Sequence, residues 1–327
     1  MDNRLVVSLS LMFMLTVSAA PSVVGQEQVV GGTWTASQTP WGDPDLQGTW
    51  TNTTTTPLER PSSLAGKNSL TTEERAALDE ENAPGIDAAP GVGAYNNFWM
   101  EQGYVFEQTS LVVDPKNGRL PNVTPRAQQR QEALLSARRS PSYPTTYEEP
   151  SLMERCITRG LPGVMLPGNY NHNYNILQTP TFVAILAEMI HDTRIIPIDG
   201  RRHINSSIHQ WMGDSRGHWE NDTLVVKTTN FSDKLYERRF SLMVWGTGKN
   251  MHMVERFTRV NENTIDYEFT LTDPTTFSRP FTASIPMTTL TTPMFEYACH
   301  EGNYAMANML RGARTDEKTA QATGGSK

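Results

Sequence analysis

Short apolar and alternating segments, separated by turn residues, follow one another through the second half of the chain. Expected strands cover residues 173–178, 181–190, 194–198, 217–220, 223–229, 251–260, 264–272 and 281–288. Turn residues separate these segments, as at Asp199-Gly200 and at Glu220-Asn221-Asp222, where a hairpin is expected. Many short strands with frequent turns are typical of an antiparallel sandwich or barrel, so the sequence predicts a mainly β fold.

The first half of the chain carries fewer strand signals. Strands are expected at residues 45–52 and 109–114, and two helices at 69–82 and 124–139. Thr71 or Thr72 can cap the first helix, and a proline in the first turn suits the start of the second. We therefore expect an irregular, partly helical lead-in over 26–150, a main β domain over 151–312 and a disordered tail over 313–327. The first two segments are expected to form one domain.

The N-terminus has the pattern of a secretory signal peptide. A polar start with Arg4 precedes an uncharged, mostly apolar run over residues 5–20, and small residues follow. The alternative is an uncleaved membrane anchor, but the run is short for a span of about 20 residues. We expect removal of residues 1–25, a periplasmic or secreted location, and no stable membrane insertion afterwards.

Composition narrows the classes of partner. Hydrophobic residues make up 37% of the chain and charged residues 19%, which is enough apolar material for a core. The formal net charge is −7 and no run of lysines or arginines occurs, so nucleic acid is not an expected partner. The two cysteines, Cys156 and Cys299, are expected to form a disulfide in an oxidising compartment, the alternative being two buried thiols.

Several segments support a resemblance to known proteins. They read PDLQGTW (44–50), ERCITRG (154–160), EMIHDTR (188–194), WMGDSR (211–216), DTLVV (222–226), VERFT (254–258) and YACHEGN (297–303). In these segments the chain resembles a large family of uncharacterised exported bacterial proteins, and its Gly48-Thr49-Trp50 triplet is similar to the first strand of lipocalin-like barrels. The resemblance implies a shared fold and export, and it implies no particular activity.

The EMIHDTR segment holds the first group of candidate functional residues. On a strand over 181–190, Glu188 shares a face with apolar side chains, while His191 points to the other face. A carboxylate on an apolar face is costly unless paired, and its raised pKa suits a general acid or base. The alternative is a buried pair with Arg194 that orders the end of the strand.

Three further groups of ionisable residues border apolar segments. One is Asp214 and Arg216, in an expected loop between two glycines. A second is Glu255, on a strand where His252 and Arg256 share the opposite face. The third is His300, which a disulfide at Cys299 would hold rigidly. Each group could instead be a structural ion pair or a structural histidine.

The leading hypothesis is an exported enzyme that uses acid–base chemistry of the lyase, isomerase, hydratase or hydrolase type on a small, partly apolar molecule. The expected catalytic residues are His191, Asp192, Arg194, Glu255 and His300. The expected substrate-binding residues are Glu188, Trp211, Asp214, Arg216, His252, Arg256 and Tyr297. Most of the catalytic set is expected around one pocket, since gathered acids and bases satisfy one another.

Two other functions fit the same sequence, a non-catalytic exported binding protein with a calycin-like pocket and a structural envelope protein. No cofactor is expected, because nucleotide and dinucleotide motifs are missing. No metal site is expected either. The histidines considered as ligands have no diagnostic spacing; they are His172, His191, His203, His209 and His300.

Overall fold

The computed structural model describes residues 34–82, 100, 101, 103–140, 142–234 and 248–324. The expected signal peptide, residues 1–25, lies outside this part of the chain. Residues from Thr35 onward group into one compact unit. Over the described residues, no helix has both the length and the apolar character needed to cross a bilayer.

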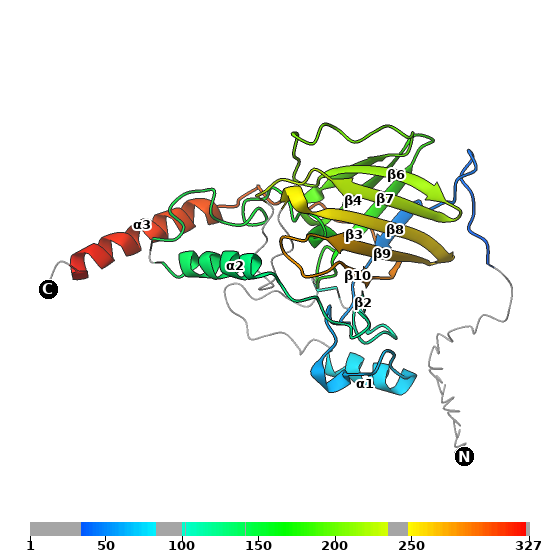
Figure 1. Cartoon of the computed structure of the whole chain (residues 1–327), viewed down its shortest axis with the longest axis horizontal. Helices are drawn as coiled ribbons and strands as arrows, with labels where there is room; N and C mark the ends of the chain where they lie inside the picture. Colours follow the sequence, from blue (N-terminus) through cyan, green and yellow to red (C-terminus); the bar gives the residue numbers. More distant parts are fainter. Residues whose placement is uncertain (1–33, 83–99, 102, 141, 235–247, 325–327) are drawn as a thin grey trace, which may run out of the picture. The chain divides into compact units, whose positions relative to one another are not determined.

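Eleven strands in the described part of the chain form one antiparallel sheet that curves into a nearly closed barrel (Figure 1). They are β1 (Gly48–Thr51), β2 (Val112–Asp114), β3 (Asn173–Gln178), β4 (Phe182–Ala187), β5 (Thr193–Pro197), β6 (Asp214–Glu220), β7 (Thr223–Thr229), β8 (His252–Asn261), β9 (Thr264–Thr272), β10 (Phe281–Ser284) and β11 (Met287–Thr289). Their order is β5-β4-β3-β1-β11-β9-β8-β7-β6, while β10 pairs with β9 and β2. The predicted mainly β barrel is therefore confirmed.

The barrel closes at a seam between β5 and β6, the two ends of the strand order. Side chains rather than a hydrogen-bonded ladder join them. Gly217 of β6 lies so close to β5 that an added Cβ would be 2.9 Å from Ile198 and 3.0 Å from Ile196. A side chain at position 217 would press against these two isoleucines, so glycine allows the seam to close.

Alternating burial along the strands fills the barrel with aromatic side chains. Along β9, buried and half-buried residues alternate, which places Tyr267 and Phe269 inside. The Tyr267 ring lies 4.8 Å from that of Phe257, and Phe269 lies 6.0 Å from Phe281 in an edge-to-face arrangement. The interior of the barrel is thus a packed core.

The Gly-x-Trp triplet anchors the first strand to this core. Trp50 is buried, and its indole Nε1 donates a hydrogen bond to the Leu46 carbonyl at 3.0 Å. The guanidinium of Arg259, on β8, lies 5.3 Å from the centre of the Trp50 ring. This cation–π contact places the guanidinium over the ring and links β1 to β8.

Helices lie at both predicted positions in the first half of the chain. Helix α1 (Thr72–Glu81) begins with a capping box in which the Thr71 side chain accepts from Glu74 N–H and the Glu74 carboxylate accepts from Thr71 N–H. Helix α2 (Pro125–Arg138) is capped by Thr124 and carries its proline in the first turn. Short 3-10 segments occur at Ser62–Leu64, Gly163–Met165, Met189–His191 and Gly248–Asn250.

The C-terminal tail is a correction to the sequence prediction. Residues from 313 to 324 belong to helix α3 (Ala305–Gly324) and not to a disordered tail (Figure 1). Ala313 is buried, and Arg314 donates hydrogen bonds to the carbonyls of Ser142, Pro144 and Thr145. Because these contacts join segments more than 160 residues apart, the local sequence gave no sign of them.

The end of β4 is a second correction. The strand stops at Ala187, before the expected end at residue 190, and a short turn over Met189–His191 follows. Ile190 and His191 adopt positive φ angles of 59° and 47°, so the predicted alternation of faces ends there. The side chains of the EMIHDTR segment therefore point in directions that strand periodicity does not give.

Candidate functional site

Arg194 and Glu255 meet inside the barrel. Both carboxylate oxygens of Glu255 accept from Arg194, at 2.9 and 2.6 Å, and the Tyr267 hydroxyl donates to one of them at 3.1 Å. Arg194 also donates to Ser215 Oγ at 3.4 Å. Burial, followed by the neighbouring Glu255 charge, raises the pKa of Tyr267 well above its ordinary value. The network is enclosed and its charges are matched, which is the geometry of a structural pair.

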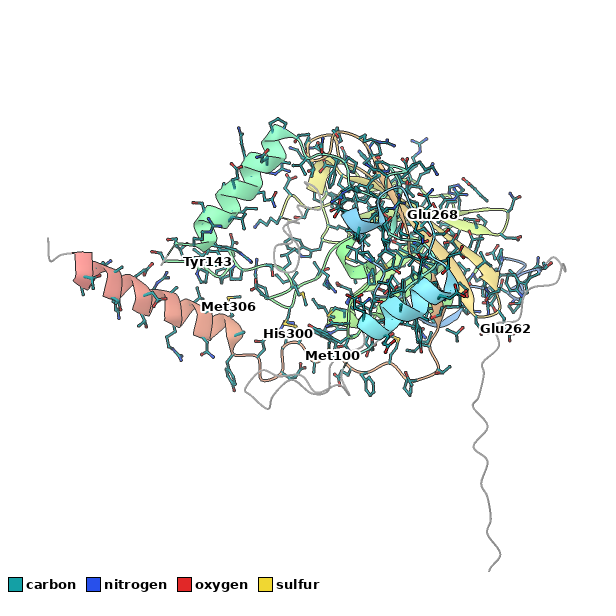
Figure 2. All side chains as sticks on the ribbon, turned by 90° about the horizontal axis from the view of Figure 1, so that it is seen from below. Met100, Tyr143, Glu262, Glu268, His300 and Met306 are labelled. Atoms are coloured by element: carbon teal, nitrogen blue, oxygen red, sulfur yellow. A yellow bond between two sulfur atoms is a disulfide. The ribbon has the colours of Figure 1, made fainter. Side chains whose placement is uncertain are left out.

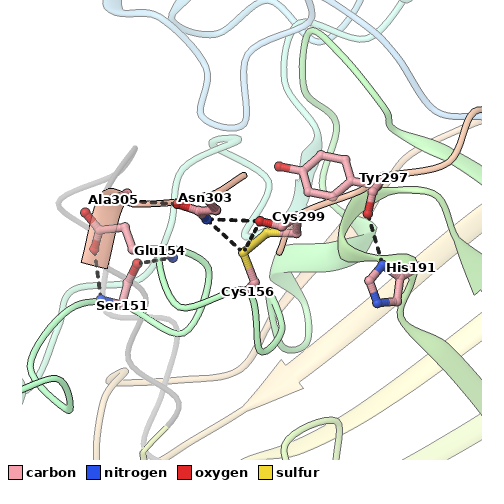
Figure 3. The surroundings of a disulfide bond; sticks show 8 residues. All are labelled: Ser151, Glu154, Cys156, His191, Tyr297, Cys299, Asn303 and Ala305. Carbon is pink, nitrogen blue, oxygen red and sulfur yellow. Dashed lines mark hydrogen bonds between the residues drawn. A yellow bond between two sulfur atoms is a disulfide. The ribbon is translucent and has the colours of Figure 1, made fainter. Parts of the chain in front are cut away.

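His191 and Asp192 bind different partners. His191 is exposed and its Nδ1 lies 3.1 Å from the Tyr297 carbonyl, to which it can donate (Figure 3). Asp192 is half-buried and accepts from the Thr158 hydroxyl at 2.7 Å. Burial raises the pKa of Asp192, and the Thr158 hydrogen bond opposes that shift. The two residues thus do not form the expected pair of base and partner.

Glu188 joins the C-terminal segment to the barrel. Its carboxylate is only 2% exposed and accepts from the amides of Asn171 at 3.0 Å and Asn173 at 2.6 Å. It also accepts from the Phe295 N–H at 2.8 Å. These three donors satisfy the buried charge, so the geometry assigns Glu188 to anchoring rather than to substrate binding.

Three of the expected substrate-binding residues lie apart from one another on the barrel. They are His252, Arg256 and Trp211. His252 is exposed at the start of β8, and Arg256 pairs with Glu220 at 3.0 Å on the surface. Trp211 is half-buried against the core. The structure therefore brings Arg194 and Glu255 into contact but does not gather the five expected catalytic residues in one place.

Asp214 forms a separate centre on the outer side of β6. It is 6% exposed, because the loop over residues 198–213 returns across it. One carboxylate oxygen accepts from His203 Nδ1 at 2.7 Å and from the Ile204 N–H at 3.1 Å, and the other accepts from Arg216 at 2.7 Å. Arg216 also donates to the Arg202 carbonyl at 3.0 Å. Asp214 is thus the fixed point of a dense hydrogen-bonded cluster.

The loop that carries His203 is rigidly built. The Asn230 amide donates to the carbonyls of Asn205 at 2.9 Å and Ile208 at 3.0 Å. Gly213 has a φ of 67°, and a Cβ there would lie 2.6 Å from the Thr229 carbonyl oxygen. Only glycine fits this position, and the turn it allows places Asp214 beneath the loop.

The hydrogen bond between His203 and Asp214 bears on the tautomer of the His203 imidazole. A carboxylate only accepts hydrogen bonds, so in the neutral imidazole this contact selects the tautomer with the proton on Nδ1 and leaves Nε2 as the acceptor. Within the described part of the chain, Nε2 has no hydrogen-bond partner, and the side chain is 32% exposed. An imidazole held in this way can accept a proton from a bound molecule. From the sequence alone, His203 stands out only as one of the histidines considered as metal ligands, because its partner Asp214 is reached through a loop of no regular spacing.

A pocket of about 270 Å³ lies beside the disulfide. Cys156 and Cys299 are bonded as predicted, and the Asn303 amide donates to the Cys299 carbonyl at 3.0 Å (Figure 3). The pocket is lined by Tyr147, Glu154, Arg155, Cys156, Ile157, His300, Asn303 and Met306. His300 and Met306 come from the segment that leads into α3 and from its first turn (Figure 2). Of the expected catalytic residues, His300 is thus the one that borders this pocket.

His172 is buried and neutral. Its Nε2 lies 2.9 Å from the guanidinium of Arg159, to which it can only be an acceptor. Burial first, and the Arg159 charge second, lower the pKa of His172 to about 3. Across the described residues, no group of three or more His, Cys, Asp or Glu side chains is placed to hold a metal ion.

Comparison of the chain with protein-family models, curated proteins and solved structures finds no match. The resemblance drawn from sequence segments therefore stays a prediction.

Proposed function

We propose that the protein is an enzyme that uses acid–base chemistry on a small molecule, with His203 as the base and Asp214 as its positioning residue. The observation that carries this proposal is the 2.7 Å contact between His203 Nδ1 and the buried Asp214 carboxylate, which leaves Nε2 accessible. The proposal keeps the reaction class expected from the sequence and transfers the role of base from His191 to His203.

The proposed step is a proton transfer. Nε2 of His203 takes the proton of a hydroxyl group on the substrate or of a water molecule, the O–H bond breaks, and its electron pair stays on oxygen. Asp214 stabilises the imidazolium that forms, and Arg216 holds Asp214 in place. In a hydrolysis or a hydration, that oxygen then bonds to an electrophilic carbon of the substrate, and the imidazolium returns the proton to the departing group or to the carbon that receives the displaced electron pair. In an elimination or an isomerisation, Nε2 instead takes a proton from carbon, the C–H electron pair forms the new double bond, and the imidazolium returns the proton to the departing group or to another carbon. None of these steps needs an organic cofactor.

The surroundings of His203 suit a partly apolar substrate. Ile208, in the same loop, is 52% exposed, and Trp211 is half-buried at its end. The disulfide supports the proposal that the protein works in an oxidising compartment, in the periplasm or outside the cell. Small-molecule binding without catalysis is the second candidate function, supported by the pocket beside the disulfide.

The first test concerns the geometry. Long-range ¹H–¹⁵N NMR of the imidazoles should show His203 with its proton on Nδ1, and Asp214→Asn should change that tautomer. A wild-type His203 with its proton on Nε2 would contradict the proposed base. His209→Gln is the matched control, because His209 lies on the same loop, is exposed and has no partner among the described residues.

The second test concerns turnover. A panel of esters, lactones, hydroxy acids and enolisable ketones should be offered in parallel to the wild type, His203→Gln and His209→Gln. We expect turnover that His203→Gln lowers by roughly 10²- to 10⁴-fold and that His209→Gln leaves unchanged. Turnover that survives in His203→Gln would refute the assignment of the base.

A further inference from the structure

We infer that the pocket beside the disulfide binds a small molecule with a carboxylate group on a partly apolar body, and that Arg155 anchors the carboxylate. This inference concerns other residues than the proton-transfer proposal and does not depend on it. It rests on an arginine without an anionic partner, on the mixed polar and apolar lining of the pocket and on the rigidity of its walls.

Arg155 is the charged group that lacks a partner. In the structure as described, its guanidinium makes one side-chain interaction, with the Tyr147 ring at 5.8 Å. The adjacent carboxylate cannot neutralise it, because Glu154 accepts from Arg138 at 3.4 Å and from the Ser151 N–H at 2.9 Å. A half-buried guanidinium stacked on an aromatic ring presents a flat edge of N–H donors, which matches a carboxylate in two parallel hydrogen bonds.

The rest of the lining fits the other end of such a ligand. Ile157, Met306 and the sulfur of Cys156 offer apolar surface, and methionine adapts to irregular shapes. The His300 imidazole also borders the pocket and has no side-chain partner among the described residues, so it can give a second hydrogen bond. The lining thus combines apolar side chains with charged and polar ones, which suits a ligand that has a polar end and an apolar body.

The walls of the pocket are fixed before any ligand binds. The disulfide joins Cys156 to Cys299 across 143 residues, and Asn303 donates to both the Cys299 carbonyl and the Cys156 sulfur. The Asn303 side chain also accepts from the Ala305 N–H, which starts α3 at the rim. A preformed pocket spares the ligand the entropic cost of ordering these segments, which raises the affinity that a few contacts can give.

The test uses three probes that share one apolar body. 4-Methylbenzoate, 4-methylbenzyl alcohol and 4-methylbenzylamine are titrated into the oxidised mature chain, and binding is followed by calorimetry and by the NMR signal of the Met306 methyl group. We expect the benzoate to bind at least tenfold more tightly than the alcohol or the amine, and to shift the Met306 signal.

Substitutions of Arg155 test whether this residue binds the carboxylate group. Arg155→Gln should weaken benzoate binding roughly 10- to 100-fold, the range of a charged hydrogen bond. The benzoate affinity of Arg155→Lys should lie between those of the wild type and Arg155→Gln. Arg311→Gln is the control, since it removes the same charge from an exposed site on α3 that does not line the pocket. Circular dichroism checks that each variant is folded, and Arg155→Lys serves if Arg155→Gln is not.

Two results would overturn the inference: equal binding of the three probes, or benzoate binding that Arg155→Gln leaves unchanged. His203→Gln should bind the benzoate like the wild type. If His203→Gln binds the benzoate normally, its turnover tests the proposed base alone. If Arg155→Gln binds the benzoate as tightly as the wild type, only the inference about the pocket is contradicted.

Discussion

Arg194 and Glu255 form a bidentate ion pair across the barrel interior, although 61 residues separate them in the chain. The pair joins β5 to β8, and the hydrogen bond from Arg194 to Ser215 adds β6. It therefore bridges the seam at which the strands are not hydrogen-bonded to one another. Its position suggests that stability, rather than turnover, depends on these two residues.

Glu255→Gln and Arg194→Met should each lower the free energy of unfolding by about 3–5 kcal/mol, because each leaves a buried group without its charge partner. Urea denaturation measures the change. Arg256→Ala is the matched control on the same strand, and the loss of its exposed pair with Glu220 should cost less than about 1 kcal/mol. A loss below 1 kcal/mol for Glu255→Gln would mean that the pair is dispensable.

The disulfide should be a second determinant of stability. Cys156→Ser with Cys299→Ser should lower the free energy of unfolding by up to about 5 kcal/mol, the chain-entropy value for a loop that spans 143 residues. Non-reducing mass spectrometry should show the two peptides linked. Two alkylatable thiols in the protein purified without reductant would contradict the bond, and an unchanged melting temperature in the double variant would contradict its contribution.

Stability should fall in mild acid because of His172. Its pKa of about 3 in the folded protein lies below the ordinary value of 6.5, so between these values the unfolded chain binds a proton that the folded one does not. The free energy of unfolding should therefore fall as the pH drops below 6.5, by at most about 1.4 kcal/mol per pH unit from this group. The raised pKa of Asp192 acts in the opposite direction.

Urea denaturation of the wild type and His172→Gln at several pH values between 4 and 7.5 isolates the contribution of His172 to the pH dependence of the free energy of unfolding. The wild type should lose more stability than the variant over that range. Parallel curves for the two proteins would show that His172 does not titrate as its burial requires.

Two glycines with similar backbone angles allow a test of the His203 loop. Gly213 has a φ of 67° and Gly200 a φ of 77°, but a Cβ at Gly200 would meet nothing within 4 Å. Gly200→Ala should cost about 1–2 kcal/mol from backbone strain alone. Gly213→Ala should cost more and should also alter the imidazole NMR signals of His203. Equal costs would mean that the loop yields to the added methyl group.

Local signals in the sequence were sufficient for several strands of the barrel but not for all. The predicted strand over 281–288 is divided into β10 and β11, and β6 begins at Asp214, in the segment that was predicted as a loop. Alternating and apolar runs predicted β3, β7 and β9 with the bounds that the structure has, since burial of one face imposes that period directly. The Thr71 cap and the proline of α2 likewise act over three or four residues. The pairing of the cysteines could be named without any geometry, because a chain with two cysteines has one possible internal disulfide.

The arrangement of the candidate sites depended on the tertiary structure. The partners Arg194 and Glu255 were named from the sequence, but their pairing with each other follows from the way β5 and β8 meet inside the barrel. His203 reaches Asp214 because a loop folds back over β6, and the folding of that loop depends on Asn230 and Gly213, which lie outside it or at its end. Local periodicity determines which face of a strand a side chain occupies, whereas the partner it finds there is set by strand order and loop packing, which involve residues far apart in the chain.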